Sequence, residues 1–315
     1  MRSPASSVAG KGIITKADLQ QYKVRELAPV ECDYRGYHIV SAPPPSSGGV
    51  VVCEILNILE GYPLKDLGFR SAQAVHYQIE AMRHAYVDRN SYLGDPDFVK
   101  NPLDRLLDKG YAEKVRAVID PNKAGVSRDL KPGVPPHEGT NTTHYSIVDS
   151  QGNAVSVTYT LNDWFGAKVT AAKTGILLND EMDDFTAKLG VPNLYGLVQG
   201  EANSITPGKR PLSSMSPTIV SRDGKPVMVI GTPGGSRIIT VVVHCILNVI
   251  DYGMNIQGGD RRAALPSAVA AGDDQRRDLC VEPRYTQDPG RHGPQAGRPA
   301  ARRPRCGHSS RGAVA

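Results

Sequence analysis

The sequence predicts an α+β fold in which helices and antiparallel strands occupy different stretches of the chain. Apolar residues with helical spacing dominate residues 50–119, and two pairs of β-branched runs, each pair joined by turn residues, follow at 143–161 and 217–231. A further apolar helical stretch comes after the second pair, at 238–250. Because the strands come in hairpins and do not alternate singly with helices, we expect a layered α+β domain and not a parallel doubly wound one.

The first predicted elements lie between residues 13 and 59. Thr15 and Asp18 suit a capping-box-like start of a short helix in ITKADLQQY. Residues 34–41 (YRGYHIVS) are β-prone and lead into the rigid turn PPPSSGG. Residues 50–59 have the apolar spacing of a buried helix.

A longer helix is predicted at residues 71–90. Pro96 and its acidic neighbours end this pattern with a turn, and short helical patterns continue to about residue 119. Residues 120–139 are rich in Pro, Gly and Lys, which predicts an exposed linker. The side chains expected on one face of the long helix are Val75, Ile79, Met82 and Tyr86.

The C-terminal half contains the two predicted hairpins, with turns at residues 150–153 and 222–225. Between them lie an acidic turn, NDEMDDF, and a Gly/Pro-rich loop that runs to about Gly208. GTPGGSR then leads into the apolar helix at 238–250, which is too short to span a bilayer.

The positive charge of the chain is confined to its C-terminal end. The formal net charge is +5, and residues 258–315 hold 11 arginines, no lysine and 6 acidic residues, which accounts for the whole surplus. The charge therefore predicts no nucleic-acid partner, and Tyr285 is the single aromatic residue of this tail that could stack on a base. The Arg-, Ala-, Pro- and Gly-rich composition is typical of a disordered arm. It is also what out-of-frame translation of a GC-rich gene produces, and the sharp change at residue 258 favours this second interpretation.

The five cysteines are scattered and have no metal-ligand spacing. We expect small apolar fillers, and neither a disulfide framework nor a zinc site. The first twelve residues contain no apolar stretch, so we predict no signal peptide and, if the sequence is complete, a cytoplasmic location.

Several well-known catalytic motifs are absent from the sequence. It contains no GxxxxGKS/T, no GxGxxG after a strand, no HExxH, no CxxC and no GxSxG. This argues against nucleotide-binding, zinc-protease and α/β-hydrolase chemistry, and we expect no metal and no cofactor. What remains is a dense set of polar residues between residues 141 and 237.

One chemistry would use these residues together. A threonine at a new N-terminus has its hydroxyl next to its own α-amine, which can accept the hydroxyl proton. Thr142 is placed for this, because it opens a predicted strand directly after the linker, and Gly234 and Gly235 could offer backbone N–H groups to an oxyanion. From the residues alone, β-propensity is the simpler explanation of a Thr pair in a strand.

Several long motifs resemble the γ-glutamyltranspeptidase family. TTHYSIVDSQGNAVSVTYTLN, GILLNDEMDDF, PLSSMSPTIV and GTPGGSR occur in that order, and GIITKADLQQY, DYRGY, PPPSSGG and YLGDPDF precede them. The resemblance runs from about Gly12 to about Gln257. It implies an N-terminal nucleophile hydrolase-like αββα sandwich, here incomplete at both ends, and autocleavage between Asn141 and Thr142. Residues 1–141 would be the C-terminal part of a large subunit with its linker, residues 142–257 the N-terminal part of the catalytic small subunit, and residues 258–315 an added disordered tail.

The resemblance also implies an activity and a set of roles. Thr142 would attack the γ-glutamyl amide of glutathione or a related compound, and water, an amino acid or a dipeptide would release the γ-glutamyl group from the resulting ester. The two subunits would stay together after cleavage, and family members are periplasmic, secreted or membrane-anchored. The implied site residues are Thr160 to orient the nucleophile, Asn162, Glu181 and Asp184 for the amine and carboxylate ends of the glutamyl group, Ser213 and Ser214 for its carboxylate, Gly234 and Gly235 for the oxyanion, and Tyr195 as the gate of a lid and partner of Asn162.

Two departures from the family leave alternatives open. The family's large subunit is longer on its N-terminal side and contains a carboxylate-binding arginine that no arginine here matches, and the resemblance stops where the arginine-rich tail begins. One alternative is an inactive fragment of a disrupted gene. Another is a related acylase of antibiotic-like amides, although acids that bind an ammonium group argue against it.

Overall fold

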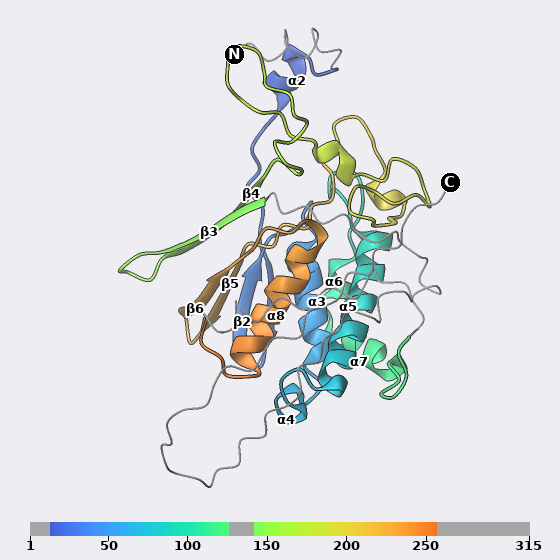
Figure 1. Cartoon of the computed structure of the whole chain (residues 1–315), viewed down its shortest axis with the longest axis vertical. Helices are drawn as coiled ribbons and strands as arrows, with labels where there is room; N and C mark the ends of the chain where they lie inside the picture. The colour runs from blue at the N-terminus through green and yellow to red at the C-terminus, as the bar shows by residue number, and fades with distance from the viewer. Residues whose placement is uncertain (1–12, 126–141, 257–315) are drawn as a thin grey trace, which may run out of the picture. The chain divides into compact units, whose positions relative to one another are not determined.

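The computed structural model describes residues 13–125 and 142–256, all within a unit that spans residues 1–275. The described residues therefore exclude Asn141, the whole of the predicted tail and most of the predicted linker. Figure 1 shows the arrangement of the elements. In chain order they are α2 (Lys16–Gln21), β1 (Val30–Tyr34), β2 (Tyr37–Ser41), α3 (Gly48–Leu59), α4 (Leu64–Leu67), α5 (Ala72–Tyr92), α6 (Leu103–Leu106), α7 (Lys109–Val118), β3 (Thr142–Val148), β4 (Ala154–Thr160), the 3-10 helices η2 (Glu181–Asp184) and η3 (Glu201–Asn203), β5 (Thr218–Arg222), β6 (Lys225–Ile230), the 3-10 helix η4 (Gly235–Arg237) and α8 (Ile238–Ile250).

The predicted α+β class is confirmed, because helices and antiparallel strands occupy separate stretches of the chain. Both predicted hairpins, β3–β4 and β5–β6, form, and so do the helices predicted at 50–59, 71–90 and 238–250. The capping box of α2 forms as well, since the Thr15 side chain accepts from the Asp18 amide and the Asp18 side chain accepts from the Thr15 amide.

The prediction of one β-prone run at residues 34–41 is wrong in its bounds. The run is divided by a turn at Arg35 and Gly36, whose φ angles of 49° and 79° lie in the left-handed region, and β1 pairs with β2 as a hairpin across this turn. Sequence inspection missed β1 because Arg-Gly is not one of the strong Asn-Gly or Asp-Gly hairpin signals.

The main sheet has the strand order β1-β2-β5-β6, and every neighbouring pair is antiparallel. The central pairing, between β2 and β5, places Ile39 opposite Val220 and Ser41 opposite Thr218. The hydroxyls of Ser41 and Thr218 hydrogen-bond at 2.9 Å. This pairing joins the N-terminal part of the chain to the second hairpin, so the two halves share one sheet.

Helix α3 is at the centre of the core. Each of its residues from Gly48 to Leu59 is buried, because the helix contacts β1 and β2 as well as α5, α7 and α8. Figure 1 shows α3 and α8 side by side, and α3 packs against β1 and β2 of the sheet.

The predicted buried face of α5 is only partly right. Met82 and Tyr86 are buried, whereas Val75 and Ile79 are only half-buried. The buried surface of α5 also includes charged side chains: Glu80, Arg83, Asp88 and Arg89. An apolar stripe alone could not locate this face, since ion pairs and hydrogen bonds bury polar groups on the same helix.

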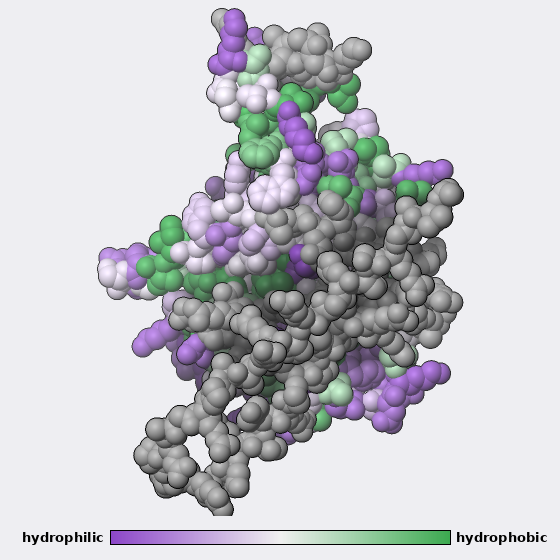
Figure 2. All heavy atoms as spheres, viewed as in Figure 1, coloured by the Kyte–Doolittle hydropathy of each residue, from purple (hydrophilic) through white to green (hydrophobic). Residues whose placement is uncertain are grey.

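Hairpin β3–β4 lies against β6. The hydroxyls of Ser146 and Ser156 donate to the carbonyl oxygens of Val229 and Ile230, at 3.0 and 3.1 Å. The other face of the hairpin carries apolar side chains that are at least half exposed, namely Tyr145, Ile147 and Tyr159. Figure 2 shows hydrophobic side chains gathered along this projecting hairpin.

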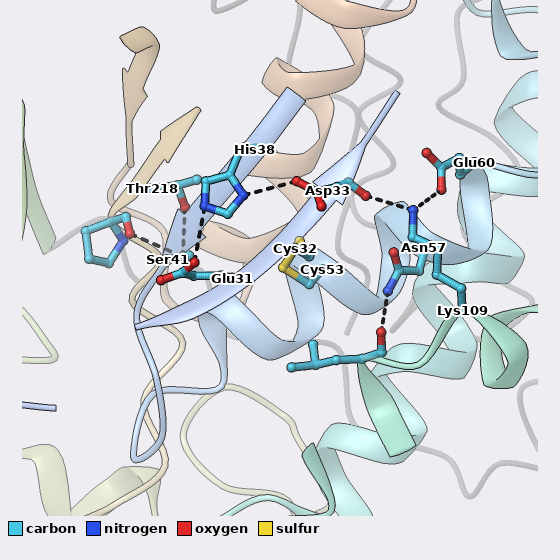
Figure 3. Close-up of a disulfide and its surroundings, with 12 residues drawn as sticks. Glu31, Cys32, Asp33, His38, Ser41, Cys53, Asn57, Glu60, Lys109 and Thr218 are labelled. Atoms are coloured by element: carbon cyan, nitrogen blue, oxygen red, sulfur yellow. Dashed lines mark hydrogen bonds and ion pairs between the residues drawn. A yellow bond between two sulfur atoms is a disulfide. The ribbon is translucent and has the colours of Figure 1, made fainter. Parts of the chain in front are cut away.

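Cys32 of β1 and Cys53 of α3 form a disulfide bond, so the expectation that the cysteines are unpaired fillers is wrong for this pair. The fold brings their Cα atoms to 5.9 Å by placing α3 against β1, although the residues are 21 positions apart. Figure 3 shows the disulfide near His38, whose ring contacts Glu31 and Asp33, and near Asn57. The Asn57 side-chain amide donates to the Leu107 carbonyl at 3.0 Å. Within residues 13–125 and 142–256, no helix is long and apolar enough to cross a membrane.

Candidate active site

Hairpin β3–β4 brings two threonines together at its open end. Thr142 is the first residue of β3 and is directly opposite Thr160, the last residue of β4. The Thr142 hydroxyl donates to Thr160 Oγ1 at 3.2 Å, and the backbone N–H of Asn162 donates to the same oxygen at 2.9 Å. Thr142 is 8% exposed, so its hydroxyl is largely shielded from water and held in one orientation.

A single pocket collects most of the residues that the sequence singled out. Gly234 precedes the pocket-lining Gly235 but is not itself part of the lining, and Asn141 lies outside the described residues. The predicted residues that line the pocket are Thr142, Thr160, Asn162, Glu181, Asp184, Tyr195, Ser213, Ser214 and Gly235. Further lining residues, which the sequence did not single out, are Arg89, Asn193, Leu197, Met215 and Ile238.

Asn162 and Tyr195 connect the hairpin to the loop at residues 189–200. Asn162 follows β4 with φ at 77°, a left-handed conformation that Asn tolerates better than most residues. Its side-chain amide nitrogen donates to the Asp180 carbonyl at 3.3 Å. The Tyr195 hydroxyl donates to Asn162 Oδ1, the contact that the family resemblance implies. Tyr195 is 8% exposed and therefore covers this side of the pocket.

Glu181 and Asp184, both on η2, form an acidic pair in the wall of the pocket. Burial raises the pKa of Glu181 to about 7, the Asp180 charge acts in the same direction, and a hydrogen bond from Asp184 opposes them. Burial and the neighbouring Glu181 raise the pKa of Asp184 well above its usual range, while the Arg89 charge opposes this rise. The pair therefore holds a proton near neutral pH, and a bound cation would favour its release.

Ser213 and Ser214 are held from two sides. The Ser213 carbonyl accepts from the Ser47 backbone N–H at 2.8 Å and from the Ser47 hydroxyl at 2.7 Å, and the Ser213 N–H donates to the Pro45 carbonyl at 2.9 Å. On the other side, Arg89 Nη2 donates to Ser214 Oγ at 3.0 Å. The segment that precedes α3 and the last turns of α5 thus fix both serines.

Gly234 and Gly235 form the turn that precedes α8. Their φ angles are 138° and 54°, and a Cβ on Gly235 would lie 2.5 Å from Cε1 of Tyr195. Glycine is therefore required at position 235 by both backbone conformation and the close approach of the tyrosine ring. The Tyr86 hydroxyl of α5 donates to the Ser236 carbonyl at 2.5 Å, and this hydrogen bond links the turn to α5. Backbone N–H groups at the start of a helix suit the stabilisation of an anion.

Sequence reasoning missed Arg89, Tyr86 and Ser47, which support the pocket from α5 and from the start of α3. The one local signal is that Tyr86 and Arg89 are three residues apart and therefore on the same side of a helix. Nothing in the sequence links them to Ser214, which is 125 positions away from Arg89. The described residues contain no group of three or more His, Cys, Asp or Glu side chains that could hold a metal ion.

Comparisons with known proteins agree on one family. The profile of the family described as gamma-glutamyltranspeptidase matches residues 5–279. The chain is 79% identical over 253 residues to a glutathione hydrolase proenzyme of Pseudomonas sp. (strain A14), an alignment that covers 80% of this chain and 44% of that protein. It is 57% identical to the glutathione hydrolase proenzyme of Escherichia coli (strain K12), over 78% of this chain and 42% of that protein.

A solved structure supports the fold assignment. The cephalosporin acylase of Bacillus halodurans matches with a TM-score of 0.65 and 28% identity, over 81% of this chain and 44% of that chain. The protein thus spans less than half the length of these relatives.

Proposed function

Because the chain belongs to the γ-glutamyltranspeptidase family, we propose that its pocket binds γ-glutamyl compounds and that Thr142 is the nucleophile for their hydrolysis or transfer. The observation that carries this proposal is the position of the Thr142 hydroxyl. It is buried at the start of a strand, hydrogen-bonded to Thr160, in the same pocket as an acidic pair and a serine pair. Glutathione is the proposed substrate class, since two of the most similar relatives are named glutathione hydrolases.

The proposed reaction begins with cleavage of the chain between Asn141 and Thr142, which divides it into segments 1–141 and 142–257 plus the tail. Cleavage gives Thr142 a free α-amine, and an α-amine with an ordinary pKa of about 7.7–8.0 can accept a proton near neutral pH. Thr142 Oγ1 then bonds to the γ-carbonyl carbon of the substrate while its proton moves to that amine. The N–H groups of Gly234 and Gly235 stabilise the resulting oxyanion.

Collapse of this intermediate breaks the amide bond. The α-ammonium of Thr142 returns the proton to the leaving amine, and a γ-glutamyl ester of Thr142 remains. Water, or the amine of an amino acid or dipeptide, attacks the ester carbon and releases glutamate or a new γ-glutamyl amide. The Thr142 hydroxyl is restored with a proton from the attacking group. Neither half of the cycle requires a metal or an organic cofactor.

Substrate recognition is proposed to depend on complementary charge. Glu181 and Asp184 face the same pocket as Ser213 and Ser214, so one side suits an ammonium group and the other suits a carboxylate. Tyr195 covers the pocket and limits the access of water. The acidic pair favours an amine-bearing glutamyl group over the acyl groups of antibiotic-like amides, although an acylase is among the structural relatives.

The experiment compares the full chain with a Thr142→Ala variant by intact mass and by release of p-nitroaniline from γ-glutamyl-p-nitroanilide. We expect two fragments from the full chain, residues 1–141 and the longer fragment that begins at Thr142, together with turnover, and we expect neither from the variant. An uncut, inactive wild-type chain would contradict the proposal and support the inactive-fragment alternative. Turnover that persists in Thr142→Ala would contradict the assignment of the nucleophile.

A further inference from the structure

Arg89 is a buried cation in the wall of the candidate active site. It is on the last turn of α5, its side chain is among the largest fully buried ones, and it lines the pocket together with Thr142 and Ser214. Nε donates to Ser47 Oγ at 2.8 Å, Nη1 to Asn90 Oδ1 at 3.0 Å and Nη2 to Ser214 Oγ at 3.0 Å. The guanidinium is therefore held in one orientation by three neutral groups.

The charge of Arg89 has no carboxylate partner at ion-pair distance among the residues that the structure describes. Burial lowers the pKa of Arg89, while the more distant Asp184 helps to keep it charged. A buried cation that bonds only to neutral groups is costly unless an anion comes close to it. This cation borders an open pocket, where a bound anion could supply the missing charge.

The guanidinium of Arg89 is linked by hydrogen bonds to both serines of the pair. Ser214 Oγ accepts its bond directly, which leaves the Ser214 hydrogen free to donate to a ligand. Ser47 Oγ accepts from Nε and donates to the Ser213 carbonyl at 2.7 Å, so Arg89 also acts on Ser213 through one intermediate hydroxyl. Donation from a cation polarises the accepting hydroxyl and makes it a better donor to an anion.

We propose that Arg89 is a positioning residue that makes the Ser213–Ser214 pair selective for a carboxylate, acting through the hydroxyl of Ser214. This inference rests on the proposed function, because it concerns the carboxylate subsite of the same pocket. Arg89 acts without contacting the reacting atoms, and its effect is on the binding of the substrate's carboxylate end. A neutral residue at position 89 would leave the Ser214 hydroxyl without its fixed donor and free to rotate.

The test measures equilibrium binding, so it does not depend on turnover. Isothermal calorimetry on the full chain compares L-glutamate with its α-amide, which has the same ammonium group but no α-carboxylate. We expect the wild-type chain to prefer L-glutamate by at least about 10-fold, in line with one hydrogen bond to a charged group. In Arg89→Gln the preference should fall below about 3-fold, chiefly through weaker binding of L-glutamate, and Arg89→Lys should restore part of it.

Two controls separate positioning from general destabilisation. Arg116→Gln removes an arginine that donates to the backbone carbonyls of Asn57 and Ile58, outside the pocket, and should leave the preference intact. Thermal unfolding of each variant shows whether it is folded at the temperature of the titration. If a folded Arg89→Gln variant lost the same affinity for L-glutamate as for its α-amide, the inference would be overturned. It would also be overturned if the wild-type chain bound neither ligand or bound both equally.

A double-mutant cycle tests the route through Ser214. If Arg89 acts through that hydroxyl, Arg89→Gln should reduce the binding of L-glutamate much less in a Ser214→Ala background than in the wild-type background. Strictly additive effects would contradict this route. Failure of the proposed function is seen separately, as absence of chain cleavage and of p-nitroaniline release in a chain that still binds L-glutamate selectively.

Discussion

Thr142 Oγ1 donates a hydrogen bond to Thr160 Oγ1 across 3.2 Å, and the two residues are direct partners in the β3–β4 register. The bond directs the Thr142 hydroxyl toward a second hydroxyl that the Asn162 N–H already holds in place. Hairpin geometry therefore sets the orientation of the proposed nucleophile before any substrate binds.

Replacing Thr160 with Val should impair the proposed reaction without unfolding the hairpin. Valine has nearly the same shape and suits a strand, but it removes the acceptor of Thr142 and of the Asn162 N–H. We expect both the rate of chain cleavage and kcat to fall by about 10²-fold or more, as for loss of other orienting contacts in active sites. Thr160→Ser keeps the hydroxyl and should retain most of the activity. Equal activities of the two variants, in mass-spectrometric and p-nitroaniline assays, would contradict this role.

Glu181 should make the protein less stable as the pH rises. Its pKa is raised to about 7 in the fold, compared with about 4.3 for an unfolded chain. Between these values the folded protein retains a proton that the unfolded chain releases, so the contribution of Glu181 to stability is full below about pH 4.3 and is lost as the pH rises through about 7. In urea unfolding from pH 5 to 8, the free energy of unfolding should decline more steeply with pH for wild type than for Glu181→Gln. Glu26→Gln, which alters an exposed carboxylate, should behave like wild type.

The same titration should have the opposite effect on substrate binding. An ammonium group binds an ionised carboxylate, and ionisation of Glu181 increases as the pH rises through about 7. We therefore expect KM for γ-glutamyl-p-nitroanilide to decrease between pH 6 and pH 8. A KM that is independent of pH across this range would argue against Glu181 as a ligand of the substrate amine.

Gly235→Ala should be more damaging than Gly224→Ala. Both glycines have positive φ, 54° and 73°, so alanine costs about 1–2 kcal/mol of backbone strain at either position. At Gly224 nothing lies within 4 Å of the added Cβ, whereas at Gly235 it would meet the Tyr195 ring at 2.5 Å. We expect a further loss of about 1–3 kcal/mol at Gly235, measured by urea unfolding. Activity should fall only in Gly235→Ala, because displacement of Tyr195 breaks its bond to Asn162.

Tyr86→Phe and Tyr34→Phe are matched substitutions that each remove one hydroxyl group. Each removes one buried hydroxyl, since Tyr86 donates to the Ser236 carbonyl and Tyr34 donates to Asp251 Oδ2 at 2.8 Å. Each should lower the free energy of unfolding by about 1–3 kcal/mol. Only Tyr86→Phe should also lower kcat, because Ser236 adjoins the Gly234–Gly235 turn. Equal effects of the two variants on kcat would show that Tyr86 contributes stability alone.

The elements that the sequence predicted well are those specified by neighbouring residues. The β3–β4 and β5–β6 hairpins follow from β-branched runs around short turns, and Thr15 with Asp18 specifies the start of α2. The β1–β2 turn at Arg35 and Gly36 was missed because its turn chemistry is atypical. The predicted face of α5 was only partly right, since Glu80 and Arg83 are buried there as an ion pair.

The sequence by itself determined the family, the α+β class and the set of polar residues around Thr142, because these are written in contiguous motifs and local patterns. Only the tertiary structure decided how that set is held together. The disulfide between Cys32 and Cys53 requires β1 to lie against α3, and the contact between Arg89 and Ser214 requires α5 to approach a segment 125 positions away. Such contacts depend on how elements pack across the core, and no local spacing of residues encodes which distant side chains will meet.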